Sequence, residues 1–368
     1  MARFFLRHQI EILAKTYKVT LISNFDGKDD SKSWLPKNVN IINIPIKRKI
    51  SLISDFKVLF LLLKIFYQYK FSLVHSVSPK AGLLAMLASF LLQVPVRIHT
   101  FTGQVWVTRK GVIKKILKFL DFLIAFFATI ALIDSHSQKD FLLKNGIVKD
   151  FKSCVTGNGS ICGVDLNKFK FDHSLGRRVR IDIGVSNNAF VFLFLGRANK
   201  DKGVIELCKA FDKLHKQYEN TTLLFVGSDE DFLYSEILKI DGVKVFPVTT
   251  DPEGYLNASD VLCLPSFREG FGHVIIEAAA CRIPAIGSNI YGISDAIVDN
   301  ETGILVAPGS VDELRDSMEL LIKNNKLLQR LGNNACERAN KSFSQELLTG
   351  EIMNLYENLL FMHSSDIS

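Results

Sequence analysis

Short apolar runs that alternate with amphipathic segments are the feature of this sequence that most restricts its fold. Runs with strand character occur at 17–23, 39–44, 72–77, 94–100 and 129–134, and again at 189–195, 222–226, 243–246, 260–264, 285–288 and 303–306. The segments between them have helical periodicity, and such alternation is typical of parallel sheets wrapped by helices. Two series of this kind predict an α/β protein with two Rossmann-like domains that face each other across a cleft.

The segment between the two series is rich in turn-forming residues. Three glycines, an asparagine and a serine fall between positions 157 and 163, and residues 168–188 show little periodicity. We therefore predict an N-terminal domain at 1–165, a linker at 166–188, a C-terminal domain at 189–345, and a C-terminal helix and tail at 346–368. The chain has 368 residues, of which 48% are hydrophobic, and this is enough for two separate cores.

A predicted strand-to-helix junction in the second half carries two acidic residues. Glu269 and Glu277 are eight residues apart, and Gly270, Phe271 and Gly272 lie between them near the expected start of a helix. Glycine lets a ligand approach the backbone, and the free amides of a helix N-terminus favour a phosphate or diphosphate. Glu277 can accept hydrogen bonds from ribose hydroxyls, and Glu269 would stand beside the sugar. The pattern favours a nucleotide-sugar site; an acid near a helix start can also be a simple electrostatic contact.

Two cations follow the apolar run at 189–195. This run ends in Gly196 and Arg197, and Lys202 comes five residues later. Ligands in open parallel sheets collect beyond the carboxyl ends of the strands, where Arg197 and Lys202 can neutralise a diphosphate leaving group. Loop charges of this kind are usually solvated, but their combination with the two later acids favours a binding site.

These motifs resemble the donor-binding half of family 4 retaining glycosyltransferases, which have the GT-B fold. Matches at 163–165 and 300–306 support the resemblance, which covers nearly the whole chain and is more specific in its C-terminal half. The resemblance implies that Arg197 and Lys202 bind the diphosphate, that Glu269 faces the donor sugar, and that Glu277 holds the ribose. The backbone of Gly196 and of residues 270–272 would complete the donor site.

The resemblance also implies a reaction. A hexose or N-acetylhexosamine would move from a nucleotide diphosphate sugar, most commonly a UDP sugar, to a lipid-linked saccharide of capsule or O-antigen assembly, with retention of anomeric configuration. The acidic run Asp229-Glu230-Asp231 imitates a metal site of another glycosyltransferase fold. We expect neither a metal nor a cofactor, because Arg197 and Lys202 already supply the countercharge.

The acceptor side is predicted at a polar loop that follows the run at 94–100. His99 is a candidate catalytic residue, and Thr102, Gly103 and Trp106 are candidate acceptor contacts. A histidine at this place can instead be held by hydrogen bonds in the core, and Trp106 can be ordinary packing. The sequence leaves both interpretations open.

Charge is distributed unevenly along the chain. Residues 1–175 contain 26 Lys and Arg against 11 Asp and Glu, and residues 176–368 contain 19 against 27. The net charges of the two parts are therefore +15 and −8, which sum to the total of +7. A basic N-terminal half predicts an anionic partner. Residues 109–120 have a basic amphipathic pattern and 56–67 an apolar pattern with spaced lysines, which favours an anionic membrane surface over nucleic acid. Both segments can instead be core helices with lysines at their ends.

The sequence also indicates where the protein is located. No apolar stretch is long enough to cross a bilayer, no secretory signal is visible, and the six cysteines have neither zinc-site nor disulfide-framework spacing. We therefore expect a cytoplasmic protein that is attached peripherally to the inner face of the cell membrane.

The start of the sequence departs from the family pattern. Family members usually open with a strand and a glycine-containing loop, whereas this sequence begins inside a helical pattern at 4–13. We expect the first strand of the N-terminal domain to be missing, which would leave the edges of its neighbours unpaired. Two alternatives to the transferase remain: a sugar-nucleotide epimerase, which shares the architecture, and a truncated, inactive relative that acts as a membrane-associated partner.

Overall fold

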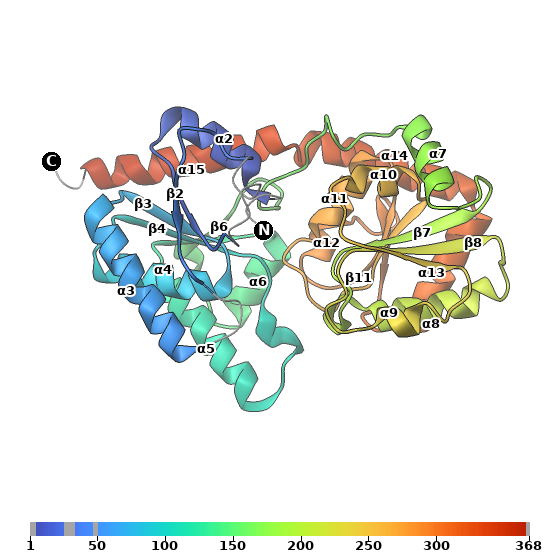
Figure 1. The fold of residues 1–368 in the computed structure, drawn as a ribbon, viewed down its shortest axis with the longest axis horizontal. Helices are drawn as coiled ribbons and strands as arrows, with labels where there is room; N and C mark the ends of the chain where they lie inside the picture. Colours follow the sequence, from blue (N-terminus) through green and yellow to red (C-terminus); the bar gives the residue numbers. More distant parts are fainter. Residues whose placement is uncertain (1–4, 26–33, 47–50, 366–368) are drawn as a thin grey trace. The chain divides into compact units, whose positions relative to one another are not determined.

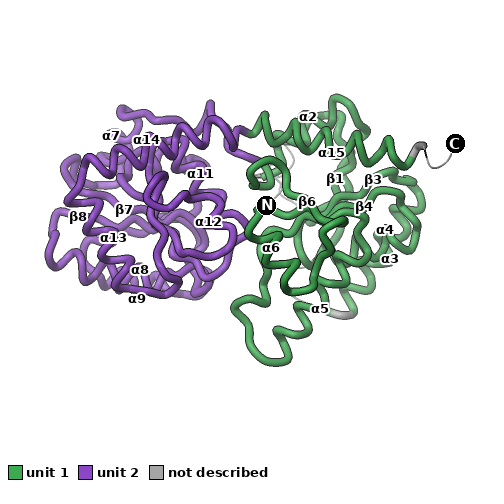
Figure 2. The backbone as a smooth tube through the Cα atoms, turned by 180° about the vertical axis from the view of Figure 1, so that it is seen from behind, with its two compact units in different colours: residues 1–162, 345–368 green, residues 163–344 purple. Residues whose placement is uncertain are grey.

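The computed structural model describes residues 5–25, 34–46 and 51–365, and the chain divides into two compact units (Figures 1 and 2). Unit 1 comprises the described residues up to Cys162 together with those from Gln345 onward, and unit 2 spans Gly163–Ser344. In Figure 2 the C-terminal helix has the colour of the N-terminal unit, so unit 1 is built from two separate parts of the sequence.

The described part of unit 1 contains six strands, all in parallel ladders. They are β1 (Thr20–Ser23), β2 (Asn40–Asn43), β3 (Leu73–Ser76), β4 (Val96–Phe101), β5 (Ile130–Ile133) and β6 (Ser153–Val155). Its described helices are α2 (Arg7–Thr16), α3 (Leu52–Tyr69), α4 (Pro79–Leu91), η2 (Val105–Thr108), α5 (Gly111–Phe127), α6 (His136–Lys144), η3 (Asp150–Lys152) and α15 (Gln345–Ser365). The sequence predicts the first five strands but not β6.

Helices cover both faces of the sheet β3-β4-β5-β6. On one face Phe101 and Ile133 pack with Trp106 and Ile124, next to α4 and α5. On the other face the alternate residues of the same strands, including Ile98, pack against α2 and α15. This period-2 alternation is the physical reason that these short runs form a doubly covered parallel sheet.

The strands β1 and β2 form a separate parallel pair. In the described part of unit 1, β1 has β2 as its only ladder partner and β3 has only β4, so no ladder joins the two sheets. The sequence predicts a missing strand in this unit, and the described strands of unit 1 form two separate sheets.

Unit 2 has one continuous sheet of parallel strands in the order β12-β11-β10-β7-β8-β9. The strands are β7 (Phe190–Leu195), β8 (Thr221–Val226), β9 (Val243–Phe246), β10 (Val261–Leu264), β11 (Ala285–Ser288) and β12 (Gly303–Val306). The helices are α7 (His173–Asp182), η4 (Lys200–Lys202), α8 (Val204–His215), α9 (Tyr234–Ile237), α10 (Pro252–Asn257), α11 (His273–Ala280), α12 (Ile293–Ala296), α13 (Val311–Lys323) and α14 (Asn325–Ser342).

The predicted linker at 166–188 lies within unit 2 and contains helix α7. The Asp172 carboxylate caps this helix by accepting hydrogen bonds from the amides of residues 174 and 175. Arg180 fixes its other end, since its guanidinium donates to the carbonyl of Ala258 and pairs with Asp260 at 3.0 Å. These tertiary contacts hold a segment whose sequence has little helical periodicity.

Among the helices of the described residues, none combines the length and the apolar composition that crossing a bilayer requires.

Candidate functional site

The strand order of unit 2 brings three loops together. β7 lies between β10 and β8, and all three strands are parallel, so the loops after their carboxyl ends meet at one edge of the sheet. The chain leaves β7 toward β8 on one side and later returns to β10 on the other. Such a reversal of strand order is the usual place for a ligand in an open α/β sheet.

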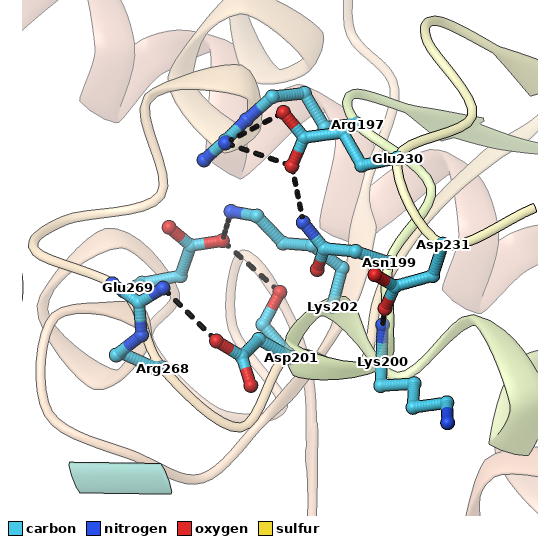
Figure 3. Close-up of polar contacts among 10 residues, drawn as sticks. Arg197, Asn199, Lys200, Asp201, Lys202, Glu230, Asp231, Arg268 and Glu269 are labelled. Atoms are coloured by element: carbon cyan, nitrogen blue, oxygen red, sulfur yellow. Dashed lines mark hydrogen bonds and ion pairs between the residues drawn. The ribbon is translucent and has the colours of Figure 1, made fainter. Parts of the chain in front are cut away.

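Lys202 and Glu269 form an ion pair at this edge (Figure 3). The Nζ of Lys202 donates to the Oε1 of Glu269, which also accepts a 3.0 Å hydrogen bond from the hydroxyl of Ser266. Both charged side chains are largely buried. The pair unites the loop after β7 with the loop after β10, as the sequence analysis predicts for a shared site.

A second ion pair holds the same two loops. The Nη2 of Arg268 lies 3.0 Å from the Oδ2 of Asp201, and the amide of Phe267 donates to the carbonyl of Asp201. Gly203 has a φ of +69°, and a Cβ at this position would lie 2.0 Å from the carbonyl oxygen of Pro265. Only glycine permits this close approach, which fixes the position of Lys202.

Arg197 makes a different contact. Its Nη1 donates to both carboxylate oxygens of Glu230, at 3.1 and 3.0 Å, and the amide group of Asn199 donates to the same carboxylate. Glu230 comes from the loop after β8, and Figure 3 shows its carboxylate beside Arg197 and Asn199. The sequence predicts the role of Arg197 but not its pairing with Glu230. The neighbouring positions of β7 and β8 in a doubly wound sheet are the signal that connects them.

The carboxylates of the acidic run 229–231 accept hydrogen bonds from other groups of unit 2. Asp229 accepts hydrogen bonds from the amides of residues 233 and 234 at the start of α9, and Asp231 accepts one from the amide of Lys200. Among the residues that the structure describes, no group of three or more His, Cys, Asp or Glu side chains is arranged to hold a metal ion.

The loop after β10 leads into helix α11. Gly272 is the N-cap residue with a φ of +81°, and Gly270 and Phe271 precede it as predicted. The side chain of Phe271 is buried against Phe343, with ring centroids 5.2 Å apart, so this residue offers its backbone rather than its ring. Among the described residues no side chain caps this helix, and its first residue, His273, follows Glu269 by four positions in the sequence.

Glu277 lies one turn into α11, next to His273. Although 19% of its side chain is exposed, desolvation raises the pKa of Glu277 to about 8, and desolvation lowers the pKa of His273 to about 4. The 3.5 Å contact between them therefore joins two neutral groups near pH 7 rather than an ion pair. In the described part of the chain, no hydrogen bond or ion pair joins Glu277 to Lys202 or Glu269. The electrostatic neighbours of Glu277 are Lys168 and Glu253.

His99 is enclosed in unit 1. Only 1% of its surface is exposed, its Nδ1 lies 2.8 Å from the hydroxyl of Ser76, and its ring packs edge-on against Phe101. A Cβ on Gly82 would lie 2.3 Å from the ring, so α4 closes over it. Burial, followed by the charge of His75, lowers the pKa of His99 to about 3, which keeps the ring neutral. This environment is the one expected for a histidine held by core hydrogen bonds.

The other predicted acceptor residues differ in exposure. Thr102 is partly exposed, whereas Gly103 is buried. Trp106 is buried, stacks on Phe141, and donates its Nε1–H to the Oδ2 of Asp121 at 2.8 Å. Trp106 therefore packs in the core of unit 1, which is the alternative that the sequence analysis leaves open.

The arrangement in unit 2 suits an anionic ligand. Arg197 and Lys202 follow the same strand, each beside a carboxylate, and a helix N-terminus begins close to Glu269 in the sequence. Preorganised cations and amides of this kind stabilise negative charge that develops on a departing oxygen. Glu269, held by Lys202 and Ser266, presents a fixed acceptor for hydroxyl groups.

Family models match both halves of the chain. The model of "Glycosyl transferases group 1" matches residues 178–338, which contain Arg197, Lys202, Glu230, Glu269 and Glu277. The model of "Glycosyl transferase 4-like" matches residues 1–127.

Two relatives align over most of the chain. The capsular polysaccharide biosynthesis glycosyltransferase CapM of Staphylococcus aureus is 32% identical over 364 residues, which cover 96% of this chain and 94% of that protein. The UDP-Gal:alpha-D-GlcNAc-diphosphoundecaprenol alpha-1,3-galactosyltransferase of Escherichia coli is 28% identical over 338 residues, which cover 89% of this chain and 86% of that enzyme.

Solved structures share the fold over the whole chain. HepE of Anabaena in complex with UDP-glucose has a TM-score of 0.80 at 20% identity, with 97% of this chain and 96% of that chain covered. WaaG, a glycosyltransferase involved in lipopolysaccharide biosynthesis, has a TM-score of 0.75 at 16% identity, with 96% and 94% covered. These likenesses confirm the predicted GT-B fold of two Rossmann-like units.

Proposed function

This chain belongs to the family-4-like glycosyltransferases of group 1, and we propose that it moves a hexose or N-acetylhexosamine from a UDP sugar to a lipid-linked saccharide, with retention of anomeric configuration. The observation that carries the proposal is the Lys202–Glu269 pair, which lies at the switch point of the unit 2 sheet with Arg197 on the same loop. A diphosphate bound there would meet two cations.

In the proposed mechanism, cleavage of the bond between the sugar and the diphosphate leaves negative charge on the departing oxygen. Lys202 and Arg197 stabilise this charge, which is the main task in such a reaction. Glu269 orients hydroxyls of the donor sugar, and Glu277 binds the ribose. His99 is not assigned a proton transfer, because its ring is enclosed and neutral. No metal is required in this scheme.

The proposed donor and acceptor take support from the relatives. The Escherichia coli enzyme is named for a UDP-linked donor and a diphosphoundecaprenol acceptor, and CapM is named for capsular polysaccharide biosynthesis. We propose the same classes of donor and acceptor here, with the protein attached peripherally to the cytoplasmic face of the cell membrane, where a lipid-linked acceptor is embedded.

A donor panel tests the proposal. The purified full chain is incubated with individual UDP sugars and with membranes that contain lipid-linked saccharides, and the lipid products are analysed by mass spectrometry. We expect one donor to add a single sugar to the lipid product. Conversion of the donor without any acceptor would indicate the epimerase instead, and failure to bind UDP in calorimetry would favour the inactive relative.

A further inference from the structure

Two ion pairs connect the loop after β7 with the loop after β10 in unit 2. Lys202 pairs with Glu269, and the residues that directly precede these two in the sequence, Asp201 and Arg268, pair with each other at 3.0 Å. Figure 3 shows both contacts. The proposed transfer uses Lys202 and Glu269, which we name the inner pair. It uses neither Asp201 nor Arg268, which we name the outer pair.

The order of charges along the two loops favours a single alignment. One loop carries an acid followed by a base, at 201 and 202, and the other carries a base followed by an acid, at 268 and 269. In the observed alignment both contacts are attractive. A slip of one residue would bring Lys202 to Arg268, or the two acids to each other, and like charges in contact repel. The outer pair therefore helps to fix which residues of the two loops meet.

Backbone contacts accompany the outer pair. The amide of Phe267 donates to the carbonyl of Asp201 at 2.8 Å, and Gly203 lies against the carbonyl of Pro265. The side chains of Arg268 and Asp201 are only 21% and 24% exposed, so solvent and salt screen their attraction less than they screen an exposed pair. The outer pair is therefore an internal contact between the two loops rather than a surface ion pair.

The inner pair cannot keep the loops aligned while a donor is bound. In the proposed function Lys202 contacts the diphosphate and Glu269 contacts hydroxyls of the donor sugar, so each exchanges its partner in the protein for a group of the donor. A lysine that leaves its partner also regains several rotamers. The outer pair has no contact with the donor in this scheme, so it can hold the two loops after the inner pair has opened.

We propose that Asp201 and Arg268 are positioning residues of the transfer reaction, whose ion pair keeps Lys202 and Glu269 in place when these two side chains turn to the donor. This inference rests on the proposed function and extends it to two residues that do not touch the donor. Displacing a reacting group by about 1 Å can cost about a hundredfold in rate, so a contact outside the donor site can control turnover. An ion pair that only stabilised the fold would leave the kcat of the folded protein unchanged.

The test compares two replacements of Arg268. Arg268→Met removes the charge, and Arg268→Lys keeps a cation that can reach the one carboxylate oxygen that the arginine contacts. In steady-state kinetics with the UDP sugar that the wild type accepts, Arg268→Met should lose at least about tenfold in kcat, with the KM for the donor within about threefold of the wild-type value. Arg268→Lys should recover most of the lost rate.

A double-mutant cycle shows whether the two residues act through their contact. Asp201→Ala should lower kcat as Arg268→Met does, and D201A/R268M should be no slower than the slower of the two single variants, because all three remove the same contact. Lys213 and Asp312 provide the matched control, since their 2.9 Å ion pair joins α8 to α13 in the same unit and is exposed. Lys213→Met and Asp312→Ala should leave kcat unchanged.

Two kinetic results would overturn the positioning proposal. One is an unchanged kcat in Arg268→Met, and the other is a pair of rate losses that multiply in D201A/R268M. If circular dichroism shows that Arg268→Met does not fold, Asp201→Asn takes its place, because it removes the charge and keeps a side-chain acceptor. Asp201→Asn should lower kcat by at least about threefold, and an unchanged kcat in this variant would equally reject the proposal.

Hydrogen exchange separates the positioning proposal from the proposed function. The amide of Phe267, which donates to the carbonyl of Asp201 in the wild type, should exchange at least about tenfold faster in Arg268→Met and at the wild-type rate in Lys213→Met. Equal exchange in Arg268→Met and the wild type would mean that the outer pair does not align the loops. If the wild type transfers no sugar, the transferase is wrong, and the exchange of this amide alone decides whether the outer pair aligns the loops.

Discussion

Arg197 and Glu230 hold each other across two neighbouring strands of unit 2, with the Nη1 of the arginine 3.0 Å from one carboxylate oxygen and 3.1 Å from the other. In the proposed reaction the same guanidinium binds the donor diphosphate. The carboxylate of Glu230 therefore competes with the donor for one cation.

We expect Glu230→Gln to bind UDP about two- to fivefold more tightly than the wild type, because a partly exposed ion pair of this kind contributes only about 0.2–1 kcal/mol and its loss frees the guanidinium. Isothermal calorimetry with UDP measures the change. Glu236→Gln is the control, since Glu236 pairs with Lys239 on the surface of the same unit. Weaker binding by Glu230→Gln would mean that Glu230 positions Arg197 rather than competing for it.

Replacement of Lys202 should remove turnover and leave the fold intact. Loss of one preorganised cation at a developing negative charge costs roughly 10²–10³ in rate, so Lys202→Ala should retain at most about one per cent of the transfer rate. Lys200→Ala is the matched control, because Figure 3 shows the Lys200 side chain pointing away from Glu269. An unchanged rate in Lys202→Ala would remove the role assigned to this residue.

The largely desolvated acid Glu277 makes stability depend on pH. Its pKa is raised from 4.5 to about 8 in the folded protein, mainly by desolvation, so its contribution to the free energy of unfolding is fully present below about pH 4.5 and is lost as the pH rises through 8. Glu277→Gln should be more stable than the wild type at pH 9, by roughly 1–3 kcal/mol, and the difference should shrink toward pH 5.

Urea unfolding at several pH values measures this difference. Glu337→Gln serves as the control, because Glu337 is an exposed partner of Lys341 on α14, and hydrogen bonding to that lysine holds its pKa below the usual value. If the free energy of unfolding of the wild type and that of Glu277→Gln change in parallel between pH 5 and 9, the raised pKa assigned to Glu277 is wrong.

The contact between Asp121 and Trp106 gives a prediction for unit 1. Asp121→Leu leaves the buried indole N–H without an acceptor and should lower the free energy of unfolding by about 1–3 kcal/mol. Asp121→Asn keeps an acceptor. It should be at least as stable as the wild type at pH 8, because burial raises the pKa of Asp121 to about 7 and ionisation there opposes folding. Asp140→Leu, at an exposed position on α6, should change stability little in urea unfolding.

Much of the fold follows from short-range patterns in the sequence. The predicted strands at 243–246, 285–288 and 303–306 coincide with β9, β11 and β12, because each is a short apolar run between turns. The sequence does not predict β6, because a strand of three residues shows no alternation. It does not predict helix α7 either, because the position of α7 depends on tertiary contacts of Arg180 rather than on its own periodicity.

Some contacts of the candidate site can also be predicted from the sequence, and others cannot. Lys202 and Glu269 meet as predicted, because both follow parallel strands that are neighbours in a doubly wound sheet. The pairing of Arg197 with Glu230 cannot be predicted without knowing that the loop after β8 lies beside the loop after β7. The sequence places Glu230 only in a run that imitates the metal site of another fold, and it predicts no metal there. The enclosure of His99 depends on Ser76 and Gly82, which only the folded chain brings to its ring.

The position of helix α15 at the end of the sequence affects the order in which the two units fold. Ile352 and Tyr356 of this helix complete the core that covers Ile98 and Leu132 in unit 1, yet they follow all of unit 2 in the sequence. Although domains generally fold in the order of their synthesis, here unit 2 can fold first, while one face of the sheet of unit 1 is covered by α2 and not yet by α15. Nascent chains that stop short of α15 should thus depend on chaperones for their first half, not their second.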